Sequence, residues 1–411
     1  MHPLQASVPQ APGLDKRKTL AMKQLFSILL VLLLSAHAQA ADIREGCKKT
    51  GLINPYKNYL SLRAAAPGQA FALEPAEPAV RQKAQDITYA STSGQRKTID
   101  QYAQDNCITS ILVAKDGKIV YESYFQGTRP DDRLYSASMA KTLTSIMIGI
   151  LVDERRLALN QKVSDLLPDF RDSAFADDQV EDLLRMTSGT QLLDCYSDTD
   201  CKSGDNTRLN VQISPATNTS AYLKSKTEKS GAPGSRFFYS GANTALLGLL
   251  IQQYGAMAPQ DLWESKVWKK IGAESDGYWI VNNGRELGYQ CCYNATARDW
   301  LRIGIMLANK GAMGEARVLS PAYVEAMLSA HPAKAQPPAQ GGRYGLHVWI
   351  PTLTPSKTLK TMEMRGSYGQ YLVVDTESKV VILQTANARS ERFFIADWPR
   401  VRHEIQNAFR H

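Results

Sequence analysis

A serine and a lysine three residues apart, Ser138 and Lys141, stand at the start of a long apolar run. Residues with this spacing lie on one face of a helix, so the ammonium group can reach the hydroxyl. A lysine buried beside other polar groups loses proton affinity, because burial disfavours its charged form, and it can then act as a base. Such a lysine can activate a serine nucleophile without a histidine. Ser-x-x-Lys also occurs on ordinary helix faces, so the pattern alone does not establish a nucleophile.

The element that must position this pair is a helix expected within residues 136–156. Its residues 143–152 are apolar on nearly every side, which is typical of a helix in a protein interior. Two strand-like runs joined by Asp116-Gly117 precede it and predict a β-hairpin. Further strands and a closing helix are expected near the C-terminus. Strands at both ends with helices between them predict an α+β fold, in which an antiparallel sheet is flanked by helices and carries an inserted helical region.

The N-terminus resembles a secretory signal. Basic residues precede the apolar run 25–34, and Ala38-Gln39-Ala40 supplies a small-residue cleavage pattern. The run is too short to span a bilayer comfortably, so we expect no stable membrane anchor after cleavage and a periplasmic or secreted protein. The expected organisation is a signal peptide at 1–40 and one domain at 41–411, with its sheet part at about 41–137 and 312–411 and its helical part at about 138–311.

Export would place the cysteines in an oxidising compartment, where an even number of them favours disulfides. The chain has six: Cys47, Cys107, Cys195, Cys201, Cys291 and Cys292. Cys195 and Cys201 flank a short polar loop and are expected to pair. The adjacent Cys291 and Cys292 leave two interpretations open, a vicinal pair or two cysteines with separate partners. We expect no metal site, because no histidine lies near them and no paired C-x-x-C spacing occurs.

Composition excludes other functional classes. The formal net charge of +8 is spread along the chain without a Lys/Arg-rich block, so no nucleic-acid partner is expected. No phosphate loop or dinucleotide fingerprint occurs, and no cofactor is expected. Beyond residue 40 the histidines are His331, His347, His403 and His411, and no Gly-x-Ser-x-Gly motif accompanies them. A Ser-His-Asp triad is therefore not expected, and each histidine is interpreted as a surface or packing residue.

Five sequence blocks resemble, in order, the motifs of the penicillin-recognising serine hydrolases. They are most similar to class C β-lactamases and their 6-aminohexanoate-dimer hydrolase and esterase relatives. The blocks are SMAKTLTSIMIGILVDERRLALNQKVSDLLPDF, VEDLLRMTSGT, PGSRFFYSGANTALLG, NATARDWLRIGIMLANKG and RGSYGQYLVVD. The resemblance covers roughly residues 108–387. It implies a β-lactamase-like fold and an acyl-enzyme mechanism on a small-molecule amide or ester, without a cofactor.

The resemblance also implies roles for particular residues. Ser138 would be the nucleophile and Lys141 its base, and Tyr239 in Tyr-Ser-Gly would carry the proton to the leaving group. A phenol with an ordinary pKa near 10 needs a neighbouring ammonium to lower it, which Lys141 can supply. The backbone N–H groups of Ser138 and Ser367 would form the oxyanion hole. Outside the block match, Tyr239 could equally be a core tyrosine.

The sequence departs from the family pattern at two places. Gly241 stands where an asparagine often follows the catalytic tyrosine, and Asn243 is the nearest substitute, either as a substrate contact or as a helix cap. Met364 stands where the third motif usually has a lysine, and Arg365 can compensate for the lost charge. Gly366 would let a substrate lie close to the strand. Both departures favour small esters and linear amides over β-lactams.

These features predict an exported serine hydrolase for a small amide or ester, such as a 6-aminohexanoate-dimer-like amide or a short-chain ester. Two alternatives stay open. One is a β-lactamase or D,D-peptidase proper. The other is a penicillin-binding sensor that keeps Ser138 and Lys141 but does not release its acyl group. A purely structural envelope protein is less well supported, because all three motif positions remain chemically plausible.

Overall fold

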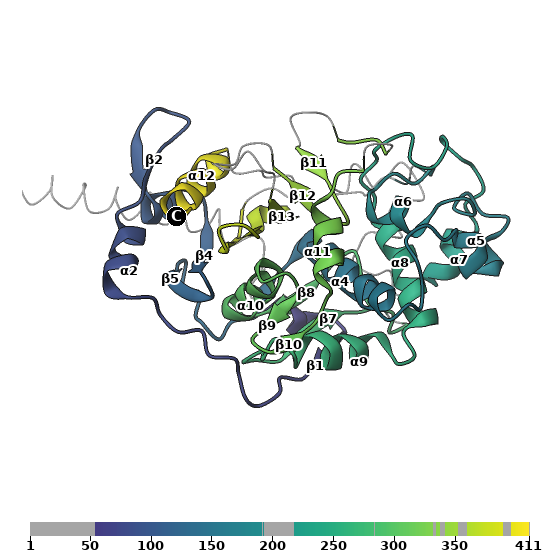
Figure 1. Cartoon of the computed structure of the whole chain (residues 1–411), viewed down its shortest axis with the longest axis horizontal. Helices are drawn as coiled ribbons and strands as arrows, with labels where there is room; N and C mark the ends of the chain where they lie inside the picture. Colours follow the sequence, from purple (N-terminus) through teal and green to yellow (C-terminus); the bar gives the residue numbers. More distant parts are fainter. Residues whose placement is uncertain are drawn as a thin grey trace, which may run out of the picture. The chain divides into compact units, whose positions relative to one another are not determined.

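The largest sheet of the computed structural model has seven strands that come from distant parts of the chain (Figure 1). Residues 54–190, 192, 218–282, 284–331, 334–337, 342–351, 360–388 and 396–410 are described, and all belong to the unit Lys49–His411. Every neighbouring pair in the order β11-β12-β13-β14-β15-β4-β5 is antiparallel. The strands are β4 (Ile108–Lys115), β5 (Lys118–Tyr124), β11 (Arg343–Tyr344), β12 (Trp349–Ile350), β13 (Thr361–Gly366), β14 (Gln370–Asp375) and β15 (Val380–Ala386). The expected α+β fold is confirmed.

The turn between β4 and β5 is the hairpin that the sequence predicted. Asp116 and Gly117 have φ angles of 51° and 79°. Both values are positive, as a tight two-residue turn between twisted antiparallel strands requires. Side chains along β4 then alternate between two apolar clusters, as the pleat of a strand dictates. Leu112 packs in one cluster with the central helices, and Val113 packs in the other.

Helices cover both faces of this sheet. In Figure 1, α4, α6 and α8 lie together away from α2 and α12, which pack near the other face. Gly304 of α10 lies so close to β15 that an added Cβ would collide with Val381. The α-helices are α2 (Pro78–Gln85), α3 (Ile99–Asp105), α4 (Ala140–Asp153), α5 (Val163–Leu166), α6 (Val180–Leu184), α7 (Thr219–Lys224), α8 (Gly241–Tyr254), α9 (Pro259–Trp263), α10 (Ala297–Ala308), α11 (Pro321–Leu328) and α12 (Trp398–Ala408). Short 3₁₀ or π turns are η1 (Pro55–Asn58), η2 (Ala137–Met139), η3 (Pro168–Phe170), η6 (Glu264–Trp268) and η8 (Ser367–Gly369).

A four-stranded antiparallel sheet in the order β1-β7-β8-β6 had no counterpart in the sequence predictions. Its last strand leads directly into η2, so this sheet holds the chain just before Ser138. The strands are β1 (Ser61–Ala64), β6 (Leu134–Tyr135), β7 (Gly277–Ile280) and β8 (Tyr293–Ala295). Two two-stranded sheets pair β2 (Thr88–Ala90) with β3 (Arg96–Thr98) and β9 (Ala312–Met313) with β10 (Ala316–Arg317). Among the described residues, no helix has the length and apolarity to cross a bilayer.

Two predictions concerned the cysteines, the pairing of Cys195 with Cys201 and the state of Cys291 and Cys292, and the structure decides the second. Cys291 and Cys292 are joined to each other, so the vicinal interpretation holds. Cys107 is also disulfide-bonded. The predicted pair of Cys195 and Cys201 lies outside the described residues.

His347 is a packing residue, as expected, and it connects the helices around the predicted nucleophile. Its Nδ1–H donates to the Leu184 carbonyl at 2.8 Å, and its Nε2 accepts from the Thr244 hydroxyl at 3.0 Å. Its own carbonyl accepts from the Thr142 hydroxyl of α4 at 2.7 Å. Burial lowers the pKa of His347 to about 3, and the charge of Lys141 adds to this effect. The imidazole is therefore neutral at physiological pH.

This histidine should make the fold sensitive to mild acid. The unfolded chain has an ordinary histidine pKa near 6.5, so the unfolded state takes up a proton below that pH while the folded state does not. We expect the His347 contribution to stability to be complete above pH 6.5 and to fall by about 1.4 kcal/mol for each unit of pH below it. Chemical denaturation between pH 7 and pH 5 measures this slope. His347→Gln should flatten it and His403→Gln should not; equal slopes in both variants would contradict the assignment.

Candidate active site

Ser138 lies in the 3₁₀ turn η2 and Lys141 in the first turn of α4, and the structure brings their side chains together. Lys141 Nζ donates to Ser138 Oγ at 3.1 Å. The hydroxyl of Ser136 anchors the start of this turn, because it accepts a hydrogen bond from the backbone N–H of Tyr293 at 2.9 Å. Ala137 has a φ of 46°, which turns the backbone sharply just before the serine. The Ser-x-x-Lys pattern thus forms a close pair instead of lying on an exposed helix face.

Lys141 is buried, with an exposed fraction of 3%, so its ammonium group depends on local partners. Besides Ser138 Oγ, it donates to the backbone carbonyl of Gln290 at 3.0 Å. Its Nζ also lies 5.0 Å from the centre of the Tyr239 ring, within the range of a cation–π interaction. The ammonium group therefore faces the serine, the tyrosine and one backbone carbonyl, which fixes its position.

Tyr239 comes from the segment just before α8 and forms part of an aromatic wall. Its ring stacks on Trp349 with centroids 5.8 Å apart and planes at 26°, and it meets Tyr344 edge-on at 6.2 Å. The helix behind it begins at Gly241 because Ser240 caps it, accepting from the Ala242 N–H at 3.2 Å. Tyr239 is only partly buried. It therefore lines a surface beside Lys141 and is not a core tyrosine.

Asn243 does not occupy either place that the sequence suggested for it. The cap of α8 is Ser240, and Asn243 is the third residue of the helix, with an exposed fraction of 1%. Its side-chain nitrogen contacts Met186 Sδ at 3.6 Å. Two residues of helix turn its side chain into the interior, so the structure argues against the predicted substrate contact at Asn243.

The end of β13 packs directly against the turn that carries Ser138. A Cβ at Gly366 would collide with the carbonyl oxygen of Ser136 and would lie 3.1 Å from Ala137 Cβ. The glycine therefore makes room for η2, whereas the sequence predicted that it would let a substrate lie close to the strand. Met364 is buried in the core at 1% exposure. The position expected to carry a lysine thus holds an uncharged side chain packed in the same apolar cluster as Met139 and Ala140.

Arg365 is held in place by a buried carboxylate. Its Nε donates to Glu363 Oε2 at 2.6 Å, and its guanidinium lies 4.7 Å from the centre of the Trp349 ring. Glu363 also accepts from Trp398 Nε1 at 2.7 Å. Burial alone would raise the pKa of Glu363, but the charges of Arg365 and Arg402 outweigh it and keep the pKa below its usual value. Since Trp349 also stacks on Tyr239, the arginine is connected to the aromatic wall of the site.

Ser367 begins η8, the turn between β13 and β14, and this turn contacts η2. Tyr368 has a φ of 66°, so the backbone reverses tightly there. The turn that holds Ser367 therefore packs against the turn that holds Ser138. An oxyanion hole made of two backbone N–H groups needs this kind of juxtaposition.

Two substitutions at Ser367 separate a backbone role from a side-chain role. Ser367→Pro removes the N–H, and the extended conformation of Gly366 (φ −128°, ψ 150°) tolerates a following proline. We expect it to lower kcat by about 10² to 10³, as for loss of one oxyanion donor. Ser367→Ala keeps the N–H and should change kcat less than about threefold. Steady-state kinetics on an activated ester measures both, and equal kcat values for the two variants would rule out the backbone N–H as a donor.

Sequence reasoning missed three contributors to this site. Gln290 acts through its backbone carbonyl, which leaves no signature in the residue type. Trp349 and Tyr344 lie in the strand-like run YGLHVWIP, where aromatic residues are equally typical of ordinary strands. Only pairing of β11 with β12 and of β12 with β13 sets them beside Tyr239 and Arg365.

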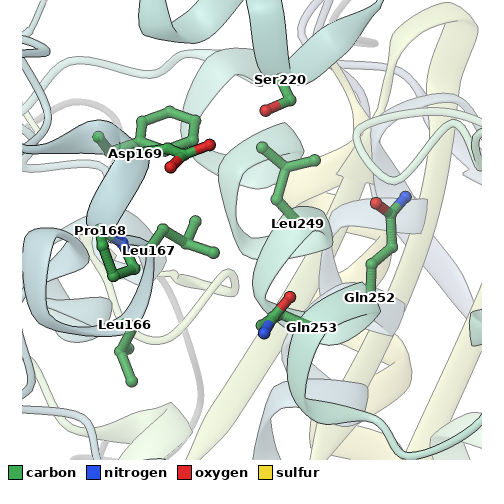
Figure 2. Close-up of a pocket in the computed structure, with 9 residues that line it drawn as sticks. Leu166, Leu167, Pro168, Asp169, Ser220, Leu249, Gln252 and Gln253 are labelled. Carbon is green, nitrogen blue, oxygen red and sulfur yellow. The ribbon is translucent and has the colours of Figure 1, made fainter.

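A separate cavity of about 420 Å³ lies in the helical region (Figure 2). Figure 2 shows Leu249 and Gln253 of α8 on the side toward the segment from Leu166 to Asp169, with Ser220 above them, and Gln252 also lines the cavity. None of the predicted catalytic or binding residues lines it. Within the described ranges no group of three His, Cys, Asp or Glu side chains is arranged to hold a metal ion.

Known proteins are similar to this chain in sequence and in fold. A 6-aminohexanoate-dimer hydrolase of Paenarthrobacter ureafaciens is 26% identical over 270 residues, which is 62% of this chain and 64% of that protein's length. A solved structure of a candidate 6-aminohexanoate-dimer hydrolase from Bacillus anthracis superposes with a TM-score of 0.72 at 21% identity, covering 85% of this chain and 90% of the other. A family VIII carboxylesterase superposes with a TM-score of 0.59 at 14% identity over 81% and 98% of the two chains. The model of the Beta-lactamase family matches residues 96–406, and this protein belongs to that family.

Proposed function

We propose that this protein is an exported serine hydrolase that cleaves a small amide or ester through an acyl-enzyme. The observation that carries the proposal is the hydrogen bond of 3.1 Å between Lys141 Nζ and Ser138 Oγ. The Tyr239 ring lies next to the same lysine nitrogen. A buried lysine on a serine hydroxyl is a means of activating a nucleophile. The named hydrolases among the relatives support the same reaction class.

In the proposed reaction Ser138 Oγ attacks the carbonyl carbon of the substrate. Lys141, as the neutral amine, accepts the hydroxyl proton and passes it through Tyr239 to the leaving amine or alcohol, and the bond to that group breaks. The backbone N–H groups of Ser138 and Ser367 stabilise the negative oxygen of the tetrahedral intermediate. A water molecule then attacks the serine ester, gives its proton back along the same path, and releases the acid while Ser138 regains its hydroxyl.

The substrate is proposed to be a short-chain ester or a linear amide like the 6-aminohexanoate dimer named in the relatives. Gly241 offers no side-chain amide to a substrate, and Met364 is buried in the core. In the family pattern, these two positions carry an asparagine and a lysine that contact a β-lactam. A β-lactam would lack both contacts in this protein. Each missing hydrogen-bonding partner costs about 1 to 3 kcal/mol.

We therefore expect measurable esterase activity and slow or undetectable nitrocefin hydrolysis. Two lost contacts correspond to at least about tenfold, and up to several thousandfold, poorer handling of β-lactams than in a dedicated β-lactamase. Parallel assays with p-nitrophenyl esters, nitrocefin and a linear aminohexanoate dimer measure the preference. The substrate proposal fails if nitrocefin is hydrolysed with kcat/KM above about 10⁵ M⁻¹s⁻¹ while short esters are much slower. Arg365→Ala would then test whether the arginine binds the β-lactam carboxylate.

A second candidate function is a penicillin-binding sensor that is acylated but not deacylated. The glycine at position 241 favours it, because a substrate-binding asparagine is missing there. Burst kinetics with a chromogenic ester distinguish the two functions. A sensor would release one equivalent of chromophore and stop, whereas a hydrolase would continue to turn over.

Export is proposed from the N-terminal pattern of basic residues, the apolar run 25–34 and Ala38-Gln39-Ala40. The protein would then act in the periplasm or outside the cell. Mass spectrometry of the protein recovered from the periplasmic fraction tests this. We expect a mature N-terminus near Ala41, and an intact N-terminus in the cytoplasmic fraction would contradict export.

A further inference from the structure

The segment 288–293 contacts the predicted site through its backbone. The carbonyl of Gln290 accepts from Lys141 Nζ at 3.0 Å. Three residues later, the N–H of Tyr293 donates to Ser136 Oγ at 2.9 Å. This short segment therefore contacts both the base and the turn that carries the nucleophile. Any change in its backbone changes the position of both groups.

The disulfide of Cys291 and Cys292 lies between these two contacts. Cys292 is buried at 4% exposure, and its carbonyl accepts from the Ile280 N–H of β7 at 3.0 Å. Cys291 is partly exposed, and its sulfur lies 3.2 Å from the Tyr135 hydroxyl. One end of the pair is thus anchored in the four-stranded sheet, while the other end faces the surface next to the site.

A bond between the sulfurs of neighbouring residues closes a small ring that includes the peptide group between them. The ring restricts rotation about the Cα–C bond of Cys291 and the N–Cα bond of Cys292, which both residues would otherwise have. The carbonyl of Gln290 belongs to the peptide group that is attached to this ring at the Cα atom of Cys291. The disulfide therefore fixes the Cα atom from which this peptide group extends, one N–Cα bond away from the Gln290 carbonyl that accepts from Lys141.

We propose that the Cys291–Cys292 disulfide is a positioning element for Lys141, and that the oxidised pair is required for full turnover. The proposal rests on the proposed serine hydrolase function. Reduction by a dithiol transfers two electrons and two protons to the pair, which gives two thiols and converts the reductant into its own disulfide. The ring is then open, and the Gln290 carbonyl is no longer fixed against the ammonium group.

The test compares the wild-type protein with the double variant Cys291→Ser/Cys292→Ser, which imitates the reduced pair. Hydrolysis of p-nitrophenyl butyrate gives kcat and KM, and labelling by a fluorophosphonate reports the reactivity of Ser138. We expect the variant to lose about ten- to a hundredfold in kcat and in labelling rate, because small misplacements of catalytic groups have effects of this size. KM and the melting temperature should stay close to the wild-type values. A residue pair with a merely structural role would instead change the melting temperature and leave the labelling rate of the folded protein unchanged.

Dithiothreitol provides the second arm. It should lower wild-type activity to the level of the double variant and leave the double variant unchanged, while alkylation and mass mapping show that Cys291 and Cys292 have become thiols. Wild-type kcat in the double variant, or an equal loss on reduction in both proteins, would overturn the proposal. Free thiols at both positions in protein isolated from an oxidising compartment would also overturn it. If the double variant does not fold, the dithiothreitol arm decides in samples where alkylation mapping finds thiols at Cys291 and Cys292 while the disulfide of Cys107 is intact. Failure of the hydrolase function looks different, because the oxidised wild type would then neither hydrolyse the ester nor react at Ser138.

Discussion

Replacing Ser138 by alanine is expected to lower hydrolysis of every good substrate by more than about a thousandfold, as removal of a catalytic nucleophile does in serine hydrolases. The hydroxyl accepts a hydrogen bond from Lys141 Nζ at 3.1 Å, so the substitution removes the reacting atom and one partner of the base. The turn itself should persist, because Ser136 and Tyr293 hold it through a separate hydrogen bond. Steady-state assays and intact-mass detection of a fluorophosphonate adduct measure the two consequences.

A surface serine provides the matched control. Ser265 is exposed and donates to the Asp261 carbonyl at 2.6 Å, so Ser265→Ala should keep wild-type activity and adduct formation. A covalent phosphonate adduct on the Ser138→Ala protein would show that another residue is the nucleophile. Unchanged circular dichroism in both variants would assign any loss of activity to chemistry and not to folding.

Replacing Lys141 by methionine should lower kcat by about 10² to 10⁴, the usual range for loss of a general base. Methionine keeps an unbranched side chain of similar length but removes the charge. Ser138 Oγ then loses the nitrogen that lies 3.1 Å away, and the Tyr239 ring loses the same nitrogen at 5.0 Å from its centre. The free energy of unfolding should not decrease much, because an apolar side chain has no charge to desolvate at a site that is 3% exposed.

Lys266 is a suitable comparison for this substitution. It forms a partly exposed ion pair with Glu154 at 2.8 Å, and such pairs contribute about 0 to 1 kcal/mol to stability. Lys266→Met should therefore leave both kcat and stability nearly unchanged. If Lys141→Met retained wild-type kcat, the base would have to be another group, and Tyr239→Phe would be the next variant to assay.

Much of the fold followed from local patterns. The Asp116-Gly117 turn, the apolar helix α4 and the close approach of Lys141 to Ser138 depend on residues within a few positions of each other. The physics that decides such features is local: a positive φ favours particular turn residues, and the helical repeat places residues three apart on one face. The blocks that resemble the family appear in the same order as its motifs, and the family match confirmed what they implied about the fold.

Other features became clear only from the packing. Asn243 was a reasonable substrate contact by sequence, but the direction of α8 turns it into the core. Gly366 was expected to accommodate substrate, yet the space that its missing Cβ leaves is filled by the Ser136 carbonyl. Neither arrangement is predictable from the sequence, because a residue type does not reveal which neighbour occupies the space beside it.

By itself, the sequence determined the class of fold, the Ser138–Lys141 pair and the family, because each is written in side-chain types at short or ordered spacings. Only the tertiary structure decided which groups surround the lysine. The Gln290 carbonyl and the Tyr239 ring reach Lys141 from segments far away along the chain. Every residue has a backbone carbonyl, so the Gln290 contact has no sequence signature, whereas the family motif pointed to Tyr239 but not to the arrangement of its ring beside Lys141. Their positions follow from strand pairing and helix packing, which depend on the whole chain at once.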